Sequence, residues 1–311
     1  MAQPRIVHTH PPHMPVDGRS YRLTVGLRRV AERHWLEVDH LREAEMALKA
    51  ELLATAHSNV IAFLPDAATR LASAALHEML VAQLQTHHDG VGGSEWARDG
   101  VLVEVRDASL HPIDQAGRLV QEDLAIMAPE GERGYVLAAA SICFPSRWSL
   151  VDKIGRDMPA IHQPVPQYAE RIGVATDLAI SRIGRSTDGA IWERQNWTLL
   201  DDYSLYQPGS LGRGKRSTSV LLEQIGQDVF FRVERQTLRR ITGVGMPAAD
   251  SPEPAPVVFT IRTHVAALTG LSPGQRADLR ATLATVPEST IEYKGWRAIL
   301  EPMRQWLAAT D

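Results

Sequence analysis

The stretch SICFPSRWSLVDKIGRDMPAIHQPVPQY, residues 141–168, is the part of the chain from which the fold is best read. It begins as an apolar run that ends at Pro145 and predicts a buried strand. A basic and aromatic turn follows, and then a short segment that is compatible with a helix. Pro164 and Pro166 stop that helix, because proline fixes φ and removes a backbone donor. We therefore expect His162 at the end of a short helix.

His162 is a candidate ligand for haem iron. Neutral imidazole is a good axial donor, and the apolar neighbours Met158 and Ile161 suit a porphyrin face. The alternative is a histidine that only caps the carbonyls of a helix end, because haem ligation by one histidine has no sharp spacing rule. The single cysteine, Cys143, could also ligate haem. The apolar run around it instead favours a buried structural thiol.

Composition indicates an ordinary globular protein. The chain has 311 residues, of which 44% are hydrophobic and 23% charged, so it is long enough to bury a sizeable core. The net charge of −4 and the scattered Lys and Arg residues argue against a nucleic-acid partner. No run of about 18 apolar residues predicts a membrane span. One cysteine excludes an intramolecular disulfide and fits a reducing compartment, so we expect a cytoplasmic protein.

Apolar side chains recur at helical spacing in the N-terminal third. We expect amphipathic helices over 35–57 and from Pro65 to about residue 88, both covering a sheet rather than binding a ligand. After a glycine-rich loop the pattern becomes typical of strands, with a helical segment at about 167–181. The strand candidates are 101–107, 124–131, 135–144, 190–201, 228–241 and 257–268. Two more helices are expected after Ser272.

The first 33 residues are expected to form a flexible leader and entry segment, because prolines interrupt them. His8, His10 and His13 lie in this leader and could bind a metal ion. The prolines around them favour a flexible segment without a dedicated site.

The last three strand candidates are unusually polar, and their Gly- and Pro-containing connections suit an antiparallel meander. Alternation places two sets of side chains on opposite faces of the strand at 228–241: Arg232, Glu234 and Gln236 on one, and Val233, Arg235, Thr237 and Arg239 on the other. These faces could be solvated and carry surface ion pairs. Alternatively, they could build a polar pocket with Arg194, Asn196 and Arg262 of the neighbouring candidates. The sequence leaves open which face would line such a pocket.

Five ordered motifs stand out along the chain: CFPSRW (143–148), KIGRDMPAIHQPVPQY (153–168), RQNWTLLD (194–201), FRVERQTLRRI (231–241) and FTIRTHV (259–265). Together they resemble the α subunit of haem-dependent oxidative N-demethylases. The similarity runs from about His34 to the end of the chain. That family resembles haem-binding PAS gas sensors in fold. The resemblance implies an α+β fold with a PAS-like antiparallel sheet, helices covering one face, and helical extensions at both ends.

On this basis, residues 34–311 are expected to form a single haem-binding domain. It would comprise a helical cover at 34–88, a PAS-like core at about 100–267 and C-terminal helices at 272–311. The ligand would lie between the sheet and the helices inserted among its strands.

The resemblance also implies an activity: oxidative N-demethylation of a small secondary amine such as dimethylamine, with dioxygen as oxidant and formaldehyde as product. Haem b would be the cofactor. Electrons would come from reductase or ferredoxin-type partner subunits that carry FMN and a 2Fe-2S cluster and use NADPH. The chain itself has neither the cysteine quartet of a cluster nor a glycine-rich dinucleotide fingerprint. A homo-oligomer is left open.

The roles implied for individual residues follow from the same resemblance. His162 would be the proximal iron ligand. Arg232, Arg194 and Asn196 would form a polar pocket that donates hydrogen bonds to dioxygen, and Glu234 would hold the substrate ammonium.

A haem pocket must also neutralise two propionates. Lys153, Arg156 and Arg147 are candidates for this, with exposed solvated cations as the alternative. Tyr168 could pack on the porphyrin edge or in the core.

Two other classes of function remain open from the sequence. A non-catalytic haem gas sensor is one, although sensors usually carry an output module and no separate module is evident. A haem-free module that binds a small ligand is the other. The chain also departs from the family pattern, since His264 stands where an aromatic residue is common and the connection at 249–256 is longer, acidic and Pro-rich. The substrate could therefore differ from dimethylamine.

Overall fold

The structure is a computed structural model. It describes residues 3–88, 109–163, 165–166, 168, 172–209 and 221–309. The strand expected at 101–107 and the glycine-rich loop before it lie outside these residues.

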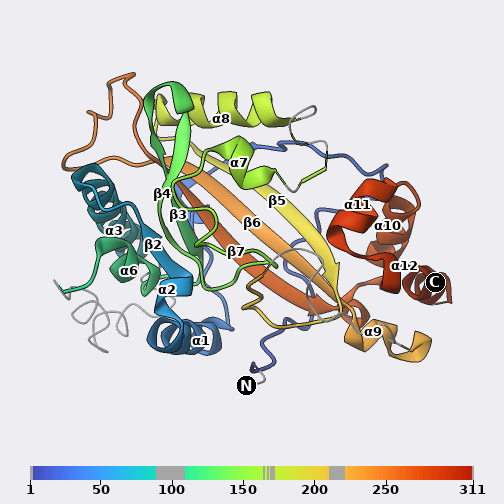
Figure 1. Ribbon diagram of the computed structural model, residues 1–311. Helices are drawn as coiled ribbons and strands as arrows, with labels where there is room; N and C mark the ends of the chain where they lie inside the picture. Colours follow the sequence, from blue (N-terminus) through green and yellow to red (C-terminus); the bar gives the residue numbers. More distant parts are fainter. Residues whose placement is uncertain are drawn as a thin grey trace.

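Seven strands of the described residues form one antiparallel sheet in the order β1-β5-β6-β7-β3-β4-β2 (Figure 1). Their bounds are β1 Arg28–Val30, β2 Ile61–Phe63, β3 Asp123–Pro129, β4 Tyr135–Ser141, β5 Ile191–Leu200, β6 Phe230–Arg240 and β7 Val257–Ala267. The three long strands β5, β6 and β7 are neighbours in the sheet, with Asn196 opposite Glu234 and Glu234 opposite Thr263. The predicted meander is thus present.

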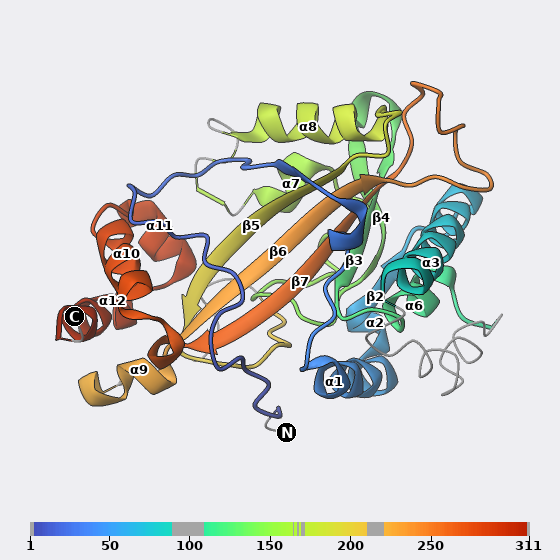
Figure 2. The same cartoon turned by 180° about the vertical axis from the view of Figure 1, so that it is seen from behind.

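Helices pack on both faces of this sheet. The N-terminal group is α1 Arg42–Thr55, α2 His57–Val60, α3 Ala67–His87 and α6 Pro112–Gly117. The pair α7 Met158–His162 and α8 Val174–Gly184 follows β4 in the chain, and Figure 1 shows it in front of the sheet. The C-terminal group lies beside α9 Ile225–Asp228, at one end of the long strands (Figure 2), and comprises α10 Pro273–Leu283, α11 Glu288–Lys294 and α12 Arg297–Ala309.

Alternation along the strands divides the interior into separate cores. Ile126 and Val258 pack with the N-terminal helices, whereas their chain neighbours Met127 and Phe259 pack under α7 and α8. A third core joins α9 to α12 to the ends of the long strands, with Trp296 buried at its centre. The antiparallel α+β fold expected from the sequence is confirmed, but helices cover both faces of the sheet where one covered face was expected.

The N-terminal segment lies along the sheet, where a flexible leader was expected. Ile6 and Val16 are buried, and the backbone N–H of His8 donates to the carbonyl of Val265 at 2.7 Å. This segment has too few alternating apolar residues to predict from the sequence alone that it packs on the sheet. No described helix is long and apolar enough to cross a membrane.

Helix boundaries were the weaker part of the prediction. The helix expected over 35–57 begins only at Arg42, because a short 3₁₀ turn and an extended segment occupy 32–41. The second helix begins after Asp66, whose side chain accepts the backbone N–H of Thr69 and caps the first turn. The short helix before the prolines ends at His162, as the sequence predicted.

Candidate active site

A cavity of about 540 Å³ lies between the sheet and the segment that contains α7 and α8. This volume is within the range of pockets that bind small molecules and cofactors. The cavity is lined by the strands β3 to β7, the helices α7 and α8, the turn at 146–156, the N-terminal segment at 21–27 and the end of α11. Segments from the whole length of the chain therefore meet there.

One parity of β6 and of β7 lines the cavity, and β5 contributes residues of both parities. On β6 these residues are Arg232, Glu234, Gln236 and Leu238, which settles the question of parity that the sequence left open. Arg194 and Asn196 of β5 lie on the same face. Arg262 was grouped with them from the sequence but lies on the opposite face, where it pairs with Asp39 and Glu45. The reason is register, since Arg262 is opposite Arg235 and not opposite Glu234.

His162 lines the cavity from the last turn of α7. Its Nδ1 lies 3.0 Å from the carbonyl oxygen of Met158, one helical turn earlier, and its ring stacks on Tyr168 with centroids 4.6 Å apart. Since a carbonyl can only accept, Nδ1 carries the proton and Nε2 keeps its lone pair. Desolvation lowers the pKa of His162 to about 4, although the bond to Met158 opposes the shift. The imidazole is therefore neutral near pH 7.

Around His162 the walls of the cavity are mainly apolar. These side chains are contributed by β4, α7, α8 and the segment before α8: Leu137, Met158, Ile161, Ile172 and Ile180. They provide a surface on which a flat hydrophobic group can be buried.

Glu234 is the carboxylate of the polar wall. Its Oε2 accepts hydrogen bonds from Gln236 Nε2 at 2.9 Å and from Asn196 Nδ2 at 3.4 Å. Two amides thus fix the orientation of the carboxylate. Lys294 and Tyr293 from the end of α11 line the same region and interact electrostatically with Glu234.

Lys294 is a cavity residue that the sequence analysis missed. Its side chain is partly buried, its Nζ donates to the carbonyl of Trp197 at 2.6 Å, and desolvation lowers its pKa to about 8. Tyr293 beside it has its pKa raised to about 12 by burial. Both residues come more than 25 positions after the end of β7, in a helix whose sequence is typical of a surface helix, so no local pattern marks them.

The two arginines of the polar wall differ in their partners. Arg232 is fully buried, and its Nη atoms donate to the backbone carbonyls of Phe144, Ser204 and Leu205 at 2.6 to 3.3 Å. Arg194 lies close enough to Glu234 for an electrostatic interaction, and burial lowers its pKa. The Nε atoms of both guanidinium groups have no hydrogen-bond partner among the described residues.

The three candidates for propionate binding also line the cavity. Lys153 Nζ donates to the carbonyl of Ile161 at 2.7 Å, and desolvation lowers its pKa to about 8. Arg156 is exposed. Arg147 is buried, pairs with Asp201 at 3.3 Å and has a positive φ of 61°. A left-handed backbone at an arginine is uncommon, and here it follows the bridge between Ser146 and Gln207.

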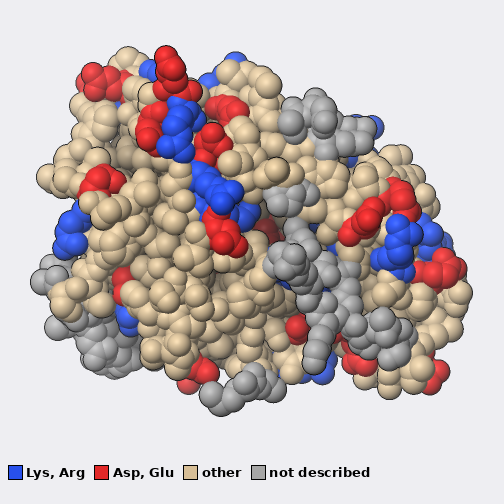
Figure 3. Space-filling model, in the orientation of Figure 1, with Lys and Arg blue, Asp and Glu red and all other residues tan. Residues whose placement is uncertain are grey.

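Cys143 lies outside the cavity lining and is buried, and desolvation raises the pKa of its thiol to about 12. A thiol in this environment stays protonated and does not favour a metal. On the face shown in Figure 3, Lys, Arg, Asp and Glu are intermixed rather than gathered into a stripe of one sign.

The chain was compared with known protein families. The model of the family "haem-dependent oxidative N-demethylase, alpha subunit-like" matches residues 26–303, nearly the whole chain. The chain belongs to this family. A search of curated proteins found no match. The family's name implies a haem-dependent oxidative enzyme, and the resemblance seen in the five sequence motifs is confirmed.

The cavity of this N-demethylase-like chain has the chemistry that a haem needs. A neutral imidazole with one nitrogen held by a backbone carbonyl is a typical axial ligand, because the second bond fixes the tautomer and the ring. Apolar walls suit the porphyrin faces, and Lys153 and Arg156 supply positive charge at the cavity. The unsatisfied Nε of Arg194 and Oε1 of Gln236 are polar atoms that a bound ligand would satisfy. The residues present thus fit haem.

Proposed function

We propose that this protein catalyses haem-dependent oxidative N-demethylation of a small secondary amine such as dimethylamine. One dialkylamine, one dioxygen, two electrons and two protons would give the monoalkylamine, formaldehyde and water. The observation that carries the proposal is one cavity that holds both a neutral, backbone-oriented His162 and a carboxylate, Glu234, fixed by two amides.

In this proposal His162 is the proximal ligand of haem b. Bound haem would supply the reduction and activation of dioxygen. Lys153, Arg156 and Arg147 would neutralise the propionates, and Tyr168, stacked on His162, would pack against the porphyrin edge.

Glu234 would bind the substrate as its ammonium ion. A partly buried carboxylate recognises a small cation through a charge-assisted hydrogen bond, and Asn196 and Gln236 hold Oε2 so that Oε1 is presented. Apolar walls would accept the methyl groups. This combination of one charge and apolar walls favours a small alkylamine over a larger polar substrate.

Arg194 and Arg232 would stabilise negative charge that develops on oxygen. Arg232 is buried and Arg194 is partly buried, and each has an Nε donor without a partner among the described residues. Electrostatic stabilisation is strongest when donors are preorganised in a site of low dielectric. The Nη bonds of Arg232 to backbone carbonyls provide that preorganisation.

Electrons would come from partner subunits of the reductase or ferredoxin type, with FMN, a 2Fe-2S cluster and NADPH. One cysteine cannot hold a 2Fe-2S cluster, so this chain depends on another protein for electrons.

The test is turnover of the haem-loaded protein with a reductase, with dimethylamine as substrate. The expected result is formaldehyde and methylamine in equal amounts, dependent on dioxygen and on the reductase. Haem binding without amine consumption would favour a gas sensor. Failure to take up haem would favour a haem-free binding module, and either outcome would overturn the proposed activity.

A further inference from the structure

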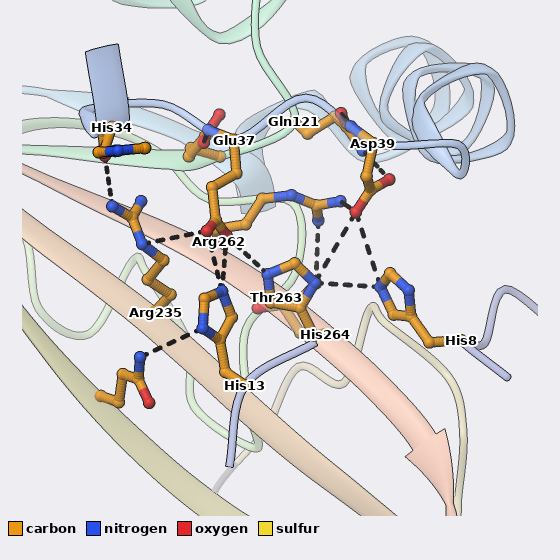
Figure 4. Close-up of polar contacts among 12 residues, drawn as sticks. His8, His13, His34, Glu37, Asp39, Gln121, Arg235, Arg262, Thr263 and His264 are labelled. Carbon is orange, nitrogen blue, oxygen red and sulfur yellow. Dashed lines mark hydrogen bonds and ion pairs between the residues drawn. The ribbon is translucent and has the colours of Figure 1, made fainter. Parts of the chain in front are cut away.

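A second cluster of ionisable side chains lies on the face of the sheet away from the cavity (Figure 4). It brings together His8 from the N-terminal segment, Glu37 and Asp39 from the extended segment before α1, and His264 from β7. His8 and His264 are both buried. The proposed demethylation uses none of these groups.

Three donor atoms in this cluster converge on one point. His8 Nε2 lies 3.0 Å from His264 Nδ1, and Asp39 Oδ2 lies 3.7 Å from the first and 3.8 Å from the second. The point equidistant from these three atoms is roughly 2.1 Å from each, which is the length of a bond from zinc to an imidazole nitrogen or a carboxylate oxygen. The triangle therefore has the size that a small divalent cation requires.

The remaining contacts place the lone pairs correctly for a metal. His264 Nε2 lies 3.0 Å from Glu37 Oε2. Since a carboxylate only accepts, Nε2 carries the proton and Nδ1 keeps its lone pair, with His8 Nε2 3.0 Å away. A carboxylate behind a ligating histidine is the usual way in which proteins orient such a ligand.

Asp39 is held in a similar way. Its Oδ1 accepts from the backbone N–H of Leu41 at 2.9 Å and from Gln121 Nε2 at 3.1 Å. Its Oδ2 accepts from Arg262 Nη2 at 2.7 Å, which leaves a second lone pair on that oxygen. The carboxylate is thus rigid before any cation binds.

The charge of the surroundings favours a cation despite Arg262. Two buried guanidinium groups, Arg235 and Arg262, face four carboxylates: Glu37, Asp39, Glu45 and Glu193. Arg28 adds one more positive charge, but from an exposed position. An excess of negative charge remains in a region of low dielectric, where a divalent ion would be stabilised.

A second grouping, His13, Glu37 and His264, also lies close together. Its contacts are 2.9 to 3.0 Å between imidazole nitrogens and carboxylate oxygens. These are complete hydrogen bonds that need no metal. In the His8 set, His8 Nε2 can donate to His264 Nδ1, but Asp39 Oδ2 lies 3.7 and 3.8 Å from these nitrogens and bonds to neither. A cation at the convergence point would link all three atoms.

We propose that His8, Asp39 and His264 form a binding site for one divalent cation of the zinc type, with water as a further ligand. Two imidazoles and one carboxylate are donors that zinc-like ions prefer to magnesium. The ion would join three segments that are distant in sequence and so fasten the N-terminal segment to β7. A structural role follows, because the ion would bind the folded chain more tightly than the unfolded one.

The test is a calorimetric titration of the untagged, full-length, haem-loaded protein with Zn²⁺ after dialysis against a chelator, with Mg²⁺ as comparison. We expect one tight site for Zn²⁺, none for Mg²⁺ at the same concentrations, and a higher melting temperature with Zn²⁺. His8→Ala and Asp39→Asn should each weaken Zn²⁺ binding by at least about tenfold.

His10→Ala is the matched control, because His10 is an exposed histidine two residues away whose Nδ1 contacts the carbonyl of Gly270. It should bind Zn²⁺ as the wild type does. Equal Zn²⁺ affinity in His8→Ala, Asp39→Asn and wild type would overturn the proposal, as would absence of a tight site. Loss of binding in His13→Ala but not in His8→Ala would instead place the ion at the other grouping. Since the readout is metal binding, these outcomes do not depend on demethylase activity.

Discussion

Glu234→Gln is the substitution that examines the amine site most directly. It keeps the size of the side chain and removes its charge. Hydrogen bonds to charged groups contribute about 1.5 to 3 kcal/mol, so the affinity for the ammonium ion should fall roughly 10- to 150-fold. Gln236 and Asn196 donate to Oε2 in the wild type, so an amide oxygen at that position would keep their bonds. Haem content should therefore stay unchanged.

The assay is a titration of ferric haem-loaded protein with dimethylamine, followed by the shift of the Soret band or by calorimetry. Glu132→Gln is a matched control, because Glu132 is an exposed carboxylate outside the cavity lining and its substitution removes the same charge. Wild type and Glu132→Gln should bind the amine equally tightly. The reasoning would be refuted if Glu234→Gln bound the amine with that same affinity.

Two further predictions concern pH and packing. Desolvation lowers the pKa of Lys294 to about 8, so its ammonium competes for Glu234 below pH 8 and is lost above it. Since a dialkylammonium ion stays protonated over this range, the affinity for the amine should rise between pH 7 and pH 9. Lys294→Met should abolish this rise. Equal wild-type affinity at both pH values would contradict the prediction. A Cβ at Gly184 would overlap with Tyr135 Oη and lie 2.8 Å from the carbonyl oxygen of Ala255, whereas one at Gly274 would meet nothing within 4 Å. Gly184→Ala should therefore lower the free energy of unfolding in urea by about 1 to 3 kcal/mol, and Gly274→Ala should not; equal stabilities would show that Tyr135 can move aside at no cost.

The sequence predicted the parts of the fold that local patterns control. Alternation and length identified β3 to β7, and the prolines at 164 and 166 correctly ended the helix at His162. Nine of the candidate site residues it identified line one cavity, whereas Arg262, grouped with them, lies on the opposite face of the sheet. Their roles remain predictions, because lining a cavity shows proximity and not chemistry.

The features that could not be predicted from the sequence are those that depend on tertiary contacts. Which residues of β6 line the cavity depends on which face of the sheet α7 and α8 cover. Since both faces of that strand carry charge, the sequence of the strand does not decide this. Lys294 enters the cavity only because the C-terminal helices pack against the ends of the long strands. The cluster of His8 with His264 joins residues 256 positions apart, and a Pro-rich segment gave no sign that it would dock on the sheet.

The most direct test of the account is a haem titration of the purified protein and of His162→Ala, recorded as ferric and ferrous absorption spectra. His87→Ala, an exposed histidine at the end of α3, is the control, and circular dichroism verifies that each variant is folded. The account predicts one haem per chain in the wild type and in His87→Ala, and loss of most haem in folded His162→Ala. A folded His162→Ala protein that kept one haem with the wild-type spectrum would contradict it.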